Sequence, residues 1–172
     1  NFMFYQRVLS RLKASARNYV MTVNYIPLAK NLLDGVVQEG NAIIDIGPGQ
    51  CELLNHLYDK WVDKVDLHAL DRHESVLDKA PPNTKLIKAN LNDLHDYYVG
   101  ISKLQIPDEC FDVVIITELI EHITFPQIFI SEISRILKDG GKVIITTPNV
   151  HMAGNRLAML FGRDKFFKNN GA

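Results

Sequence analysis

The chain has 172 residues, of which 47% are hydrophobic and 23% charged, as in an ordinary globular domain with a single core. No apolar run approaches the ~18 residues of a membrane-spanning helix, so membrane-embedded proteins are excluded and we expect a cytoplasmic protein. Its two cysteines, Cys51 and Cys110, are isolated, which excludes a disulfide framework and a Cys-x-x-Cys zinc site.

The net charge of −1 hides an uneven distribution along the chain. Residues 1–33 hold five basic and no acidic residues, whereas residues 34–150 hold ten basic and nineteen acidic ones. Residues 151–172 are basic again, with four basic residues against one acid. Two interpretations stay open, an anionic partner with nucleic acid among the candidates, or ordinary solvated helix faces.

The predicted elements alternate between helices and strands. Residues 2–23 lack Gly and Pro and predict one or two helices, and a further helix is expected from Pro27 to Val37. Apolar and amphipathic runs then predict strands at 42–46, 65–70, 84–88, 112–116 and 142–147, and helices at 50–61, 73–79 and 126–138. This alternation predicts βαβ units, and hence a Rossmann-like α/β fold whose mostly parallel sheet has helices on both faces.

The helix at 126–138 is expected to end at a glycine cap. Ile130, Ile133 and Leu137 form its apolar stripe, and Gly140 follows the last of them as a C-terminal cap would. Residues 94–110 form a long connection that we expect to include a short helix.

A glycine-punctuated turn, Gly47-Pro48-Gly49, follows the apolar run 42–46. A buried strand that passes into a helix through such a turn is where open α/β sheets bind ligands. The dinucleotide pattern G-x-G-x-x-G would need glycine at Glu52, and Pro48 lacks the N–H group that a pyrophosphate would use. The pattern acid-x-G-x-G-x-G fits Asp45, Gly47 and Gly49 and departs only at Cys51.

With this loop, the chain resembles the class I (Rossmann-like) S-adenosylmethionine-dependent methyltransferases over residues 30–150. The resemblance also rests on Asp71, Phe111-Asp112-Val113-Val114, Glu118–His122 and Leu137-Lys138-Asp139-Gly140-Gly141. It implies S-adenosylmethionine as cofactor, S-adenosylhomocysteine as product, and in-line attack of an acceptor atom on the sulfonium methyl group.

The resemblance assigns the first cofactor residues to the glycine loop. Asp45 is expected near the methionine amino group, with Gly47, Pro48 and Gly49 forming the cofactor loop. A capping role for Asp45 within the loop is the structural alternative, because a buried acid needs a partner.

Two later turns are expected to hold the adenosine. Asp71, followed by Arg72, ends the second strand and is expected to accept the ribose hydroxyls. Asn90 and Leu91 follow the third strand, where the family usually has an acid for the adenine amino group. An asparagine oxygen can also accept there, and Asp93 stays open as the alternative.

The run Glu118 to His122 follows the fourth strand and leaves three interpretations open. If the turn is helical, Glu118, Glu121 and His122 share one face. In the first interpretation, Glu118 bounds the methionine pocket and His122 is the candidate catalytic base. In the second, the three side chains bind a divalent metal together with His151. In the third, they only pack the turn. We predict Glu118 as a cofactor residue and His122 as catalytic, and no metal site.

The last part of the chain is expected to face the acceptor. We divide a single domain into N-terminal helices (1–40), a cofactor-binding core (41–148) and a substrate-side tail (149–172) with a short helix at 156–161. Tyr25 is expected either to cover the cofactor or to pack in the core. We expect an O-methyltransferase for a small or anionic acceptor, with a catalytically silent binding or scaffold subunit of the same fold as the alternative.

The family usually adds two more strands after the fifth, and none is predicted here. The last strand would then be an open apolar edge, which proteins avoid. We therefore expect the sequence to be a truncated piece of a longer chain, or a second copy to cover the edge in a homo-oligomer.

Overall fold

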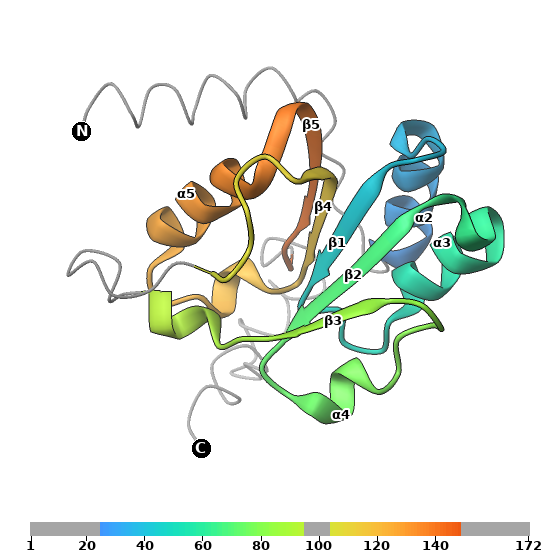
Figure 1. Ribbon diagram of the computed structural model, residues 1–172. Helices are drawn as coiled ribbons and strands as arrows, with labels where there is room; N and C mark the ends of the chain where they lie inside the picture. Colours follow the sequence, from blue (N-terminus) through green and yellow to red (C-terminus); the bar gives the residue numbers. More distant parts are fainter. Residues whose placement is uncertain (1–24, 95–103, 149–172) are drawn as a thin grey trace, which may run out of the picture.

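The computed structural model describes residues 25–94 and 104–148. Within these ranges a parallel sheet of five strands has the order β3-β2-β1-β4-β5, with β1 at its centre (Figure 1). The strands are β1 (Ala42–Ile46), β2 (Asp66–Asp71), β3 (Lys85–Lys88), β4 (Phe111–Thr117) and β5 (Leu137–Thr146). The predicted α/β fold class is confirmed.

Helices cover both faces of this sheet. They are α2 (Tyr25–Val36), α3 (Glu52–Trp61), α4 (Glu74–Leu77) and α5 (Pro126–Ile136), with 3-10 turns η1 (Val62–Lys64) and η3 (Ile120–His122). Figure 1 shows α5 on one side of the sheet and α2 and α3 on the other. No helix in the described ranges is both long and apolar enough to cross a membrane.

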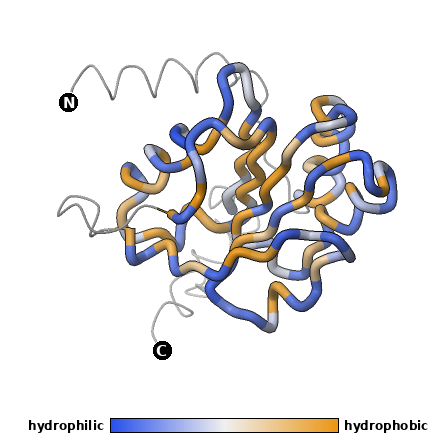
Figure 2. Tube along the Cα trace, viewed as in Figure 1, coloured by the Kyte–Doolittle hydropathy of each residue, from blue (hydrophilic) through white to orange (hydrophobic). Residues whose placement is uncertain are grey.

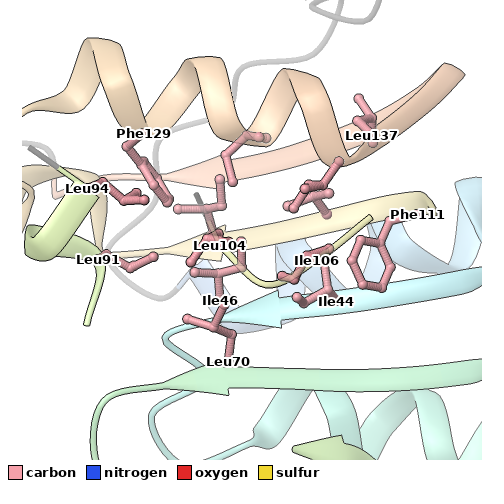
Figure 3. Packing of buried hydrophobic residues seen from close by; sticks show 14 of the residues in the cluster. Ile44, Ile46, Leu70, Leu91, Leu94, Leu104, Ile106, Phe111, Phe129 and Leu137 are labelled. Atoms are coloured by element: carbon pink, nitrogen blue, oxygen red, sulfur yellow. The ribbon is translucent and has the colours of Figure 1, made fainter. Parts of the chain in front are cut away.

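The alternation of side chains along β1 divides the core into two layers. Ile44 and Ile46 point toward α5 and join a cluster that includes Phe129 and Ile133, which are fully buried (Figure 3). Ile43 belongs to the second cluster, with residues of α2 and α3. Figure 2 shows the consequence, since the central strands are hydrophobic over nearly their whole length, as expected of a sheet covered on both faces.

The end of α5 differs from the prediction. The helix ends at Ile136, and Leu137 already pairs with Phe111 of β4 as the first residue of β5. The register then shifts, because the next pair joins Lys142 and Val113, so residues 138–141 are an irregularity at the start of the strand. Gly140 has the left-handed φ of 78° that the prediction required, but it lies in this irregularity and caps no helix.

Asp112 explains why this segment joins the sheet so early. Its Oδ2 accepts hydrogen bonds from the Ala42 N–H at 2.8 Å and from Lys138 Nζ at 2.7 Å. Burial raises the pKa of Asp112, but the hydrogen bonds from Lys138 and from the Ala42 N–H, together with the positive charge of Lys138, have the larger opposite effect, so the pKa is lowered. The ionised carboxylate therefore ties the starts of β1, β4 and β5 together.

Candidate functional site

An open pocket of about 420 Å³ lies where β1, β2 and β3 end. This is the edge at which open α/β sheets bind their ligands. The pocket is lined by Gly47, Leu70, Asp71, Arg72, His73, Ala89, Leu91, Asn92, Leu119, His122 and Ile123.

The glycine loop forms the pocket wall beside β1. Gly47 has φ of 70° and donates its N–H to the Leu70 carbonyl at 2.8 Å. A Cβ atom at Gly47 would lie 3.1 Å from both terminal carbons of Leu119, which also lines the pocket. Glycine is therefore required at Gly47 by its backbone conformation and by the space available. Gly49, with φ of 55°, has open space around it.

Cys51 occupies the third glycine position of the pattern without obstructing the pocket. Its φ of 56° is the left-handed value that glycine would adopt, and its backbone N–H donates to the Pro48 carbonyl at 2.7 Å. The side chain is fully buried in the core beside α3, and Sγ donates to the Val76 carbonyl at 3.6 Å. The departure from the pattern thus places a side chain in the core and leaves the pocket wall unchanged.

Asp45 is a buried acid at the end of β1. The residue is 1% exposed, and within the described part of the chain its Oδ1 has no hydrogen-bond partner. Burial raises the pKa of Asp45 to about 7. An unpaired buried carboxyl group is costly, so this atom fits a ligand that brings a cationic donor, as the methionine amino group of S-adenosylmethionine does.

Asp71 lines the pocket directly after β2. Its Oδ1 accepts the N–H of His73 at 2.8 Å, which fixes the carboxylate at the end of the strand. The neighbouring Arg72 donates from Nε to His73 Nε2 at 2.7 Å. A carboxylate held in this way can accept two hydroxyl groups of a ribose in the pocket.

The turn after β3 contributes one of its two predicted residues to the pocket, and one residue that was not predicted. Asn90 is exposed, its Nδ2 donates to Asp93 Oδ1 at 2.9 Å, and it is absent from the pocket lining. Leu91 lines the pocket as predicted, together with Asn92. Asn92 Oδ1 accepts the backbone N–H of Thr124 at 3.1 Å, so it joins this turn to the segment after η3. Sequence reasoning missed Asn92, because only the tertiary contact reveals it.

The segment after β4 is not an α-helix. The prediction that Glu118, Glu121 and His122 share one helix face is therefore not met. Glu118 has φ of 49° and precedes the short turn η3, so the helical spacing does not apply. Glu118 Oε1 accepts a hydrogen bond from Thr146 Oγ1 at 2.9 Å, while His122 lines the pocket. Among residues 25–94 and 104–148, no three His, Cys, Asp or Glu side chains are placed to hold a metal ion. His151, the further ligand considered, lies outside the described residues.

A second polar group lies at the ends of β1 and β4, beside the first residue of α2. The hydroxyl of Tyr25 lies near the side chain of Thr117, which lowers the pKa of Tyr25. Burial raises the pKa of Tyr25, and Glu118, Glu52 and Asp45 raise it further by their negative charge. Tyr25 therefore lies near the acidic groups of the site, and its two predicted roles, covering the cofactor or packing in the core, stay predictions.

The predicted site residues fall into three groups. Gly47, Asp71, Arg72, Leu91 and His122 meet at the pocket. Pro48 and Gly49 belong to the same loop, and Asp45 and Glu118 lie at the ends of the adjacent strands β1 and β4. Asn90 lies apart, with its side chain turned to Asp93. Their functional roles stay predictions, and the tail 149–172 and the predicted helices at 2–23 and 156–161 lie outside the described residues.

A central strand that ends in a glycine loop, followed by an acid after the next parallel strand, is typical of the nucleoside-binding domains of the Rossmann-like class. The family model described as "Methyltransferase domain" matches residues 38–166, which is most of the chain. The chain belongs to this methyltransferase domain family.

Two curated proteins match shorter segments. The mitochondrial ubiquinone biosynthesis O-methyltransferase of Mus musculus is 38% identical over 53 residues, 31% of this chain and 14% of that protein. An S-adenosylmethionine-dependent methyltransferase of Mycolicibacterium smegmatis is 36% identical over 65 residues, 38% of this chain and 23% of that protein. The matched segments thus span less than a quarter of either curated relative.

Solved structures share the fold at low identity. A SAM-dependent methyltransferase from Aquifex aeolicus has a TM-score of 0.57 at 16% identity, covering 92% of this chain and 86% of its own. The (4+2)-cyclase SpnF has a TM-score of 0.55 at 16% identity, covering 85% of this chain and 58% of its own. Since one of these neighbours is named for a different reaction, the fold alone does not identify the chemistry.

Proposed function

We propose that this chain binds S-adenosylmethionine and transfers its methyl group to an oxygen atom of a small or anionic acceptor. The observation that carries the proposal is the buried Oδ1 of Asp45, which has no partner within the described residues and lies at the end of the strand that enters the glycine loop. When bound, the cofactor supplies an electrophilic methyl group on a sulfonium.

In this proposal, different residues bind different parts of the cofactor. Asp71 accepts the ribose hydroxyls, and Leu91 and Leu119 provide apolar contact for the adenine ring. Gly47 lets the ligand approach the backbone closely, since any side chain there would meet Leu119. Asp45 binds the methionine ammonium group, which supplies the donor that its Oδ1 lacks.

The acceptor side of the proposal rests on charge and on His122. Arg72 lines the pocket and brings a permanent positive charge, which favours an anionic acceptor, although the carboxylate of Asp71 lies beside it. The imidazole of His122 can take the proton of an acceptor hydroxyl at neutral pH. The segment shared with the mouse O-methyltransferase supports oxygen as the acceptor atom.

Calorimetric titration of S-adenosylmethionine into the chain tests the cofactor part of the proposal. We expect micromolar binding, and about tenfold to hundredfold weaker binding for Asp71→Asn, because a charge-assisted pair of hydrogen bonds is lost. Asp78→Asn is the matched control, since Asp78 is exposed at the end of α4 and absent from the pocket lining.

Absence of binding by the wild-type chain would contradict the proposal and favour a silent scaffold of the same fold. Equal affinity for Asp71→Asn and the wild type would place the ligand elsewhere. Tritiated S-adenosylmethionine incubated with phenols, carboxylic acids and amines then tests the acceptor. Labelling of amines alone would contradict transfer to oxygen.

A further inference from the structure

The charged groups that act on the Tyr25 hydroxyl in the described part of the chain are carboxylates. Glu118, Glu52 and Asp45 all raise the pKa of Tyr25 by their charge. The strand register explains this gathering, because Ile46 of β1 lies opposite Ile116 of β4, so Asp45 and Glu118 lie at the ends of adjacent strands. We call these two carboxyl groups, Asp45 and Glu118 at the ends of β1 and β4, the acidic end of the site. Glu118 directly precedes Leu119, which lines the pocket.

Two hydrogen-bond arrangements fix this acidic end in place. Glu118 donates its backbone N–H to the Thr146 carbonyl at 3.1 Å, and its Oε1 accepts from Thr146 Oγ1 at 2.9 Å. The left-handed backbone of Glu118, with φ of 49°, is held by these contacts to β5.

Asp45 provides an independent sign that this end takes a cation. It is 1% exposed, and its Oδ1 has no partner among the described residues. A single ammonium group on Asp45 leaves the charge of half-buried Glu118 available to a second positive group nearby. A ligand with two cationic centres therefore matches the acidic end better than a ligand with one.

We propose that Glu118 makes the cofactor site discriminate between S-adenosylmethionine and S-adenosylhomocysteine by charge; this rests on the proposed function. In the transfer, the bond between sulfur and the methyl carbon breaks with its electron pair left on sulfur, while a bond from the acceptor oxygen to the methyl carbon forms. The acceptor proton passes to His122 and then to solvent. The sulfonium becomes a neutral thioether, so only the reactant carries the second positive charge, and Glu118 favours the reactant over the product.

The expected size follows from Coulomb's law. Opposite unit charges about 5 Å apart in a half-exposed site, with an effective dielectric constant of about 40 to 80, change affinity by about fourfold to fifteenfold. The neutral variant Glu118→Gln should therefore weaken binding of S-adenosylmethionine by about this factor and leave S-adenosylhomocysteine within about twofold.

Calorimetry with three ligands on the full chain tests the inference. S-adenosylmethionine and sinefungin carry a positive charge at the reacting position, whereas S-adenosylhomocysteine does not. We expect Glu118→Gln to lower the affinity for both cationic ligands relative to S-adenosylhomocysteine. Glu39→Gln is the matched control, because Glu39 is exposed and pairs with Lys64 before β1, at the other end of the strand from Asp45.

The possible results separate the inference from the function on which it rests. If the wild type binds none of the three ligands, the proposed function itself fails. If the wild type binds them and Glu118→Gln weakens all three equally, or none, charge discrimination by Glu118 is wrong while cofactor binding stands. If Glu39→Gln changed the ratio of the affinities for S-adenosylmethionine and S-adenosylhomocysteine by the same factor, the effect would come from the net charge of the protein. That result would also overturn the inference.

Discussion

At the scale of single residues, Asp45 links the stability of the chain to its ligand. A carboxyl group that burial makes hard to ionise favours folding while it is protonated and opposes folding once it is charged. The pKa of Asp45 is about 7 in the folded chain and near 3.8 when unfolded. The folded state therefore binds more protons than the unfolded state between these two values.

We predict that the free energy of unfolding of the ligand-free chain falls as pH rises from about 4 to about 7. The shift of roughly three pKa units corresponds to a loss of roughly 3 to 4 kcal/mol. Urea unfolding at pH 5 and pH 7.5 should show roughly 2 to 3 kcal/mol of this loss, and Asp45→Asn should remove most of the difference. Burial also raises the pKa of Glu118, which adds a part in the same direction.

An unchanged pH dependence in Asp45→Asn would contradict this assignment. The pKa of Asp34 is lowered, chiefly by its hydrogen bond from Lys60. Stability gained from Asp34 is lost only as pH falls below about 4, so it lies outside the window of the test.

Residue patterns predicted the loop better than the contacts that surround it. Asp45, Gly47 and Gly49 follow from local spacing, because backbone conformation and burial at the end of a strand restrict the residue types. Asn92 and Thr146 were missed, because each acts through a partner about 30 positions away in the sequence. Neither hydrophobic periodicity nor a local motif indicates which distant residue a side chain will contact.

At the scale of elements, a buried ion pair fastens the segment before β4 to α5. Arg135 donates from Nη2 to Glu132 Oε2 at 2.8 Å, and from Nη1 to the Ile106 carbonyl at 2.7 Å. Glu132 is 2% exposed, and its Oε2 also accepts the N–H of Leu104 at 3.3 Å. The pair therefore closes the described chain between 104 and 108 onto the helix.

We predict that Arg135→Ala destabilises the fold by about 3 to 5 kcal/mol, because Glu132 is left charged and buried. The double variant Glu132→Gln/Arg135→Met should recover at least half of this loss, since it removes the unpaired charge. Urea unfolding measures both. As a control, Lys64→Ala, which breaks an exposed pair with Glu39 at 3.4 Å, should cost less than about 1 kcal/mol. A double variant no more stable than Arg135→Ala would contradict the explanation.

The elements themselves were largely predictable, and their ends were less so. All five strands in the described ranges overlap the predicted runs. The physical reason is clearest for β1 and β4, which are covered on both faces and apolar along most of their length. The end of α5 was wrong by two residues, since pairing of Leu137 with Phe111 in the sheet prevailed over the glycine cap. The prediction that Glu118, Glu121 and His122 share one face was wrong, because the turn that contains them is not an α-helix.

At the scale of the whole molecule, the order of the strands brings the site together. The glycine loop after β1, Asp71 after β2 and the turn after β3 come from positions some 45 residues apart, yet they meet at one pocket. Parallel pairing places all strand ends with the same direction at one edge. The α/β class and this edge followed from the sequence, whereas the contact of Glu118 with Thr146 of β5 did not.

The central claim is that this edge binds S-adenosylmethionine in one orientation. A crystal structure of the chain grown with S-adenosylmethionine tests it most directly. The account predicts the ribose hydroxyls within about 3 Å of the Asp71 carboxylate and the methionine ammonium group within about 3 Å of Asp45 Oδ1. Ligand density away from the glycine loop, or Asp45 still without a partner in the complex, would contradict the account.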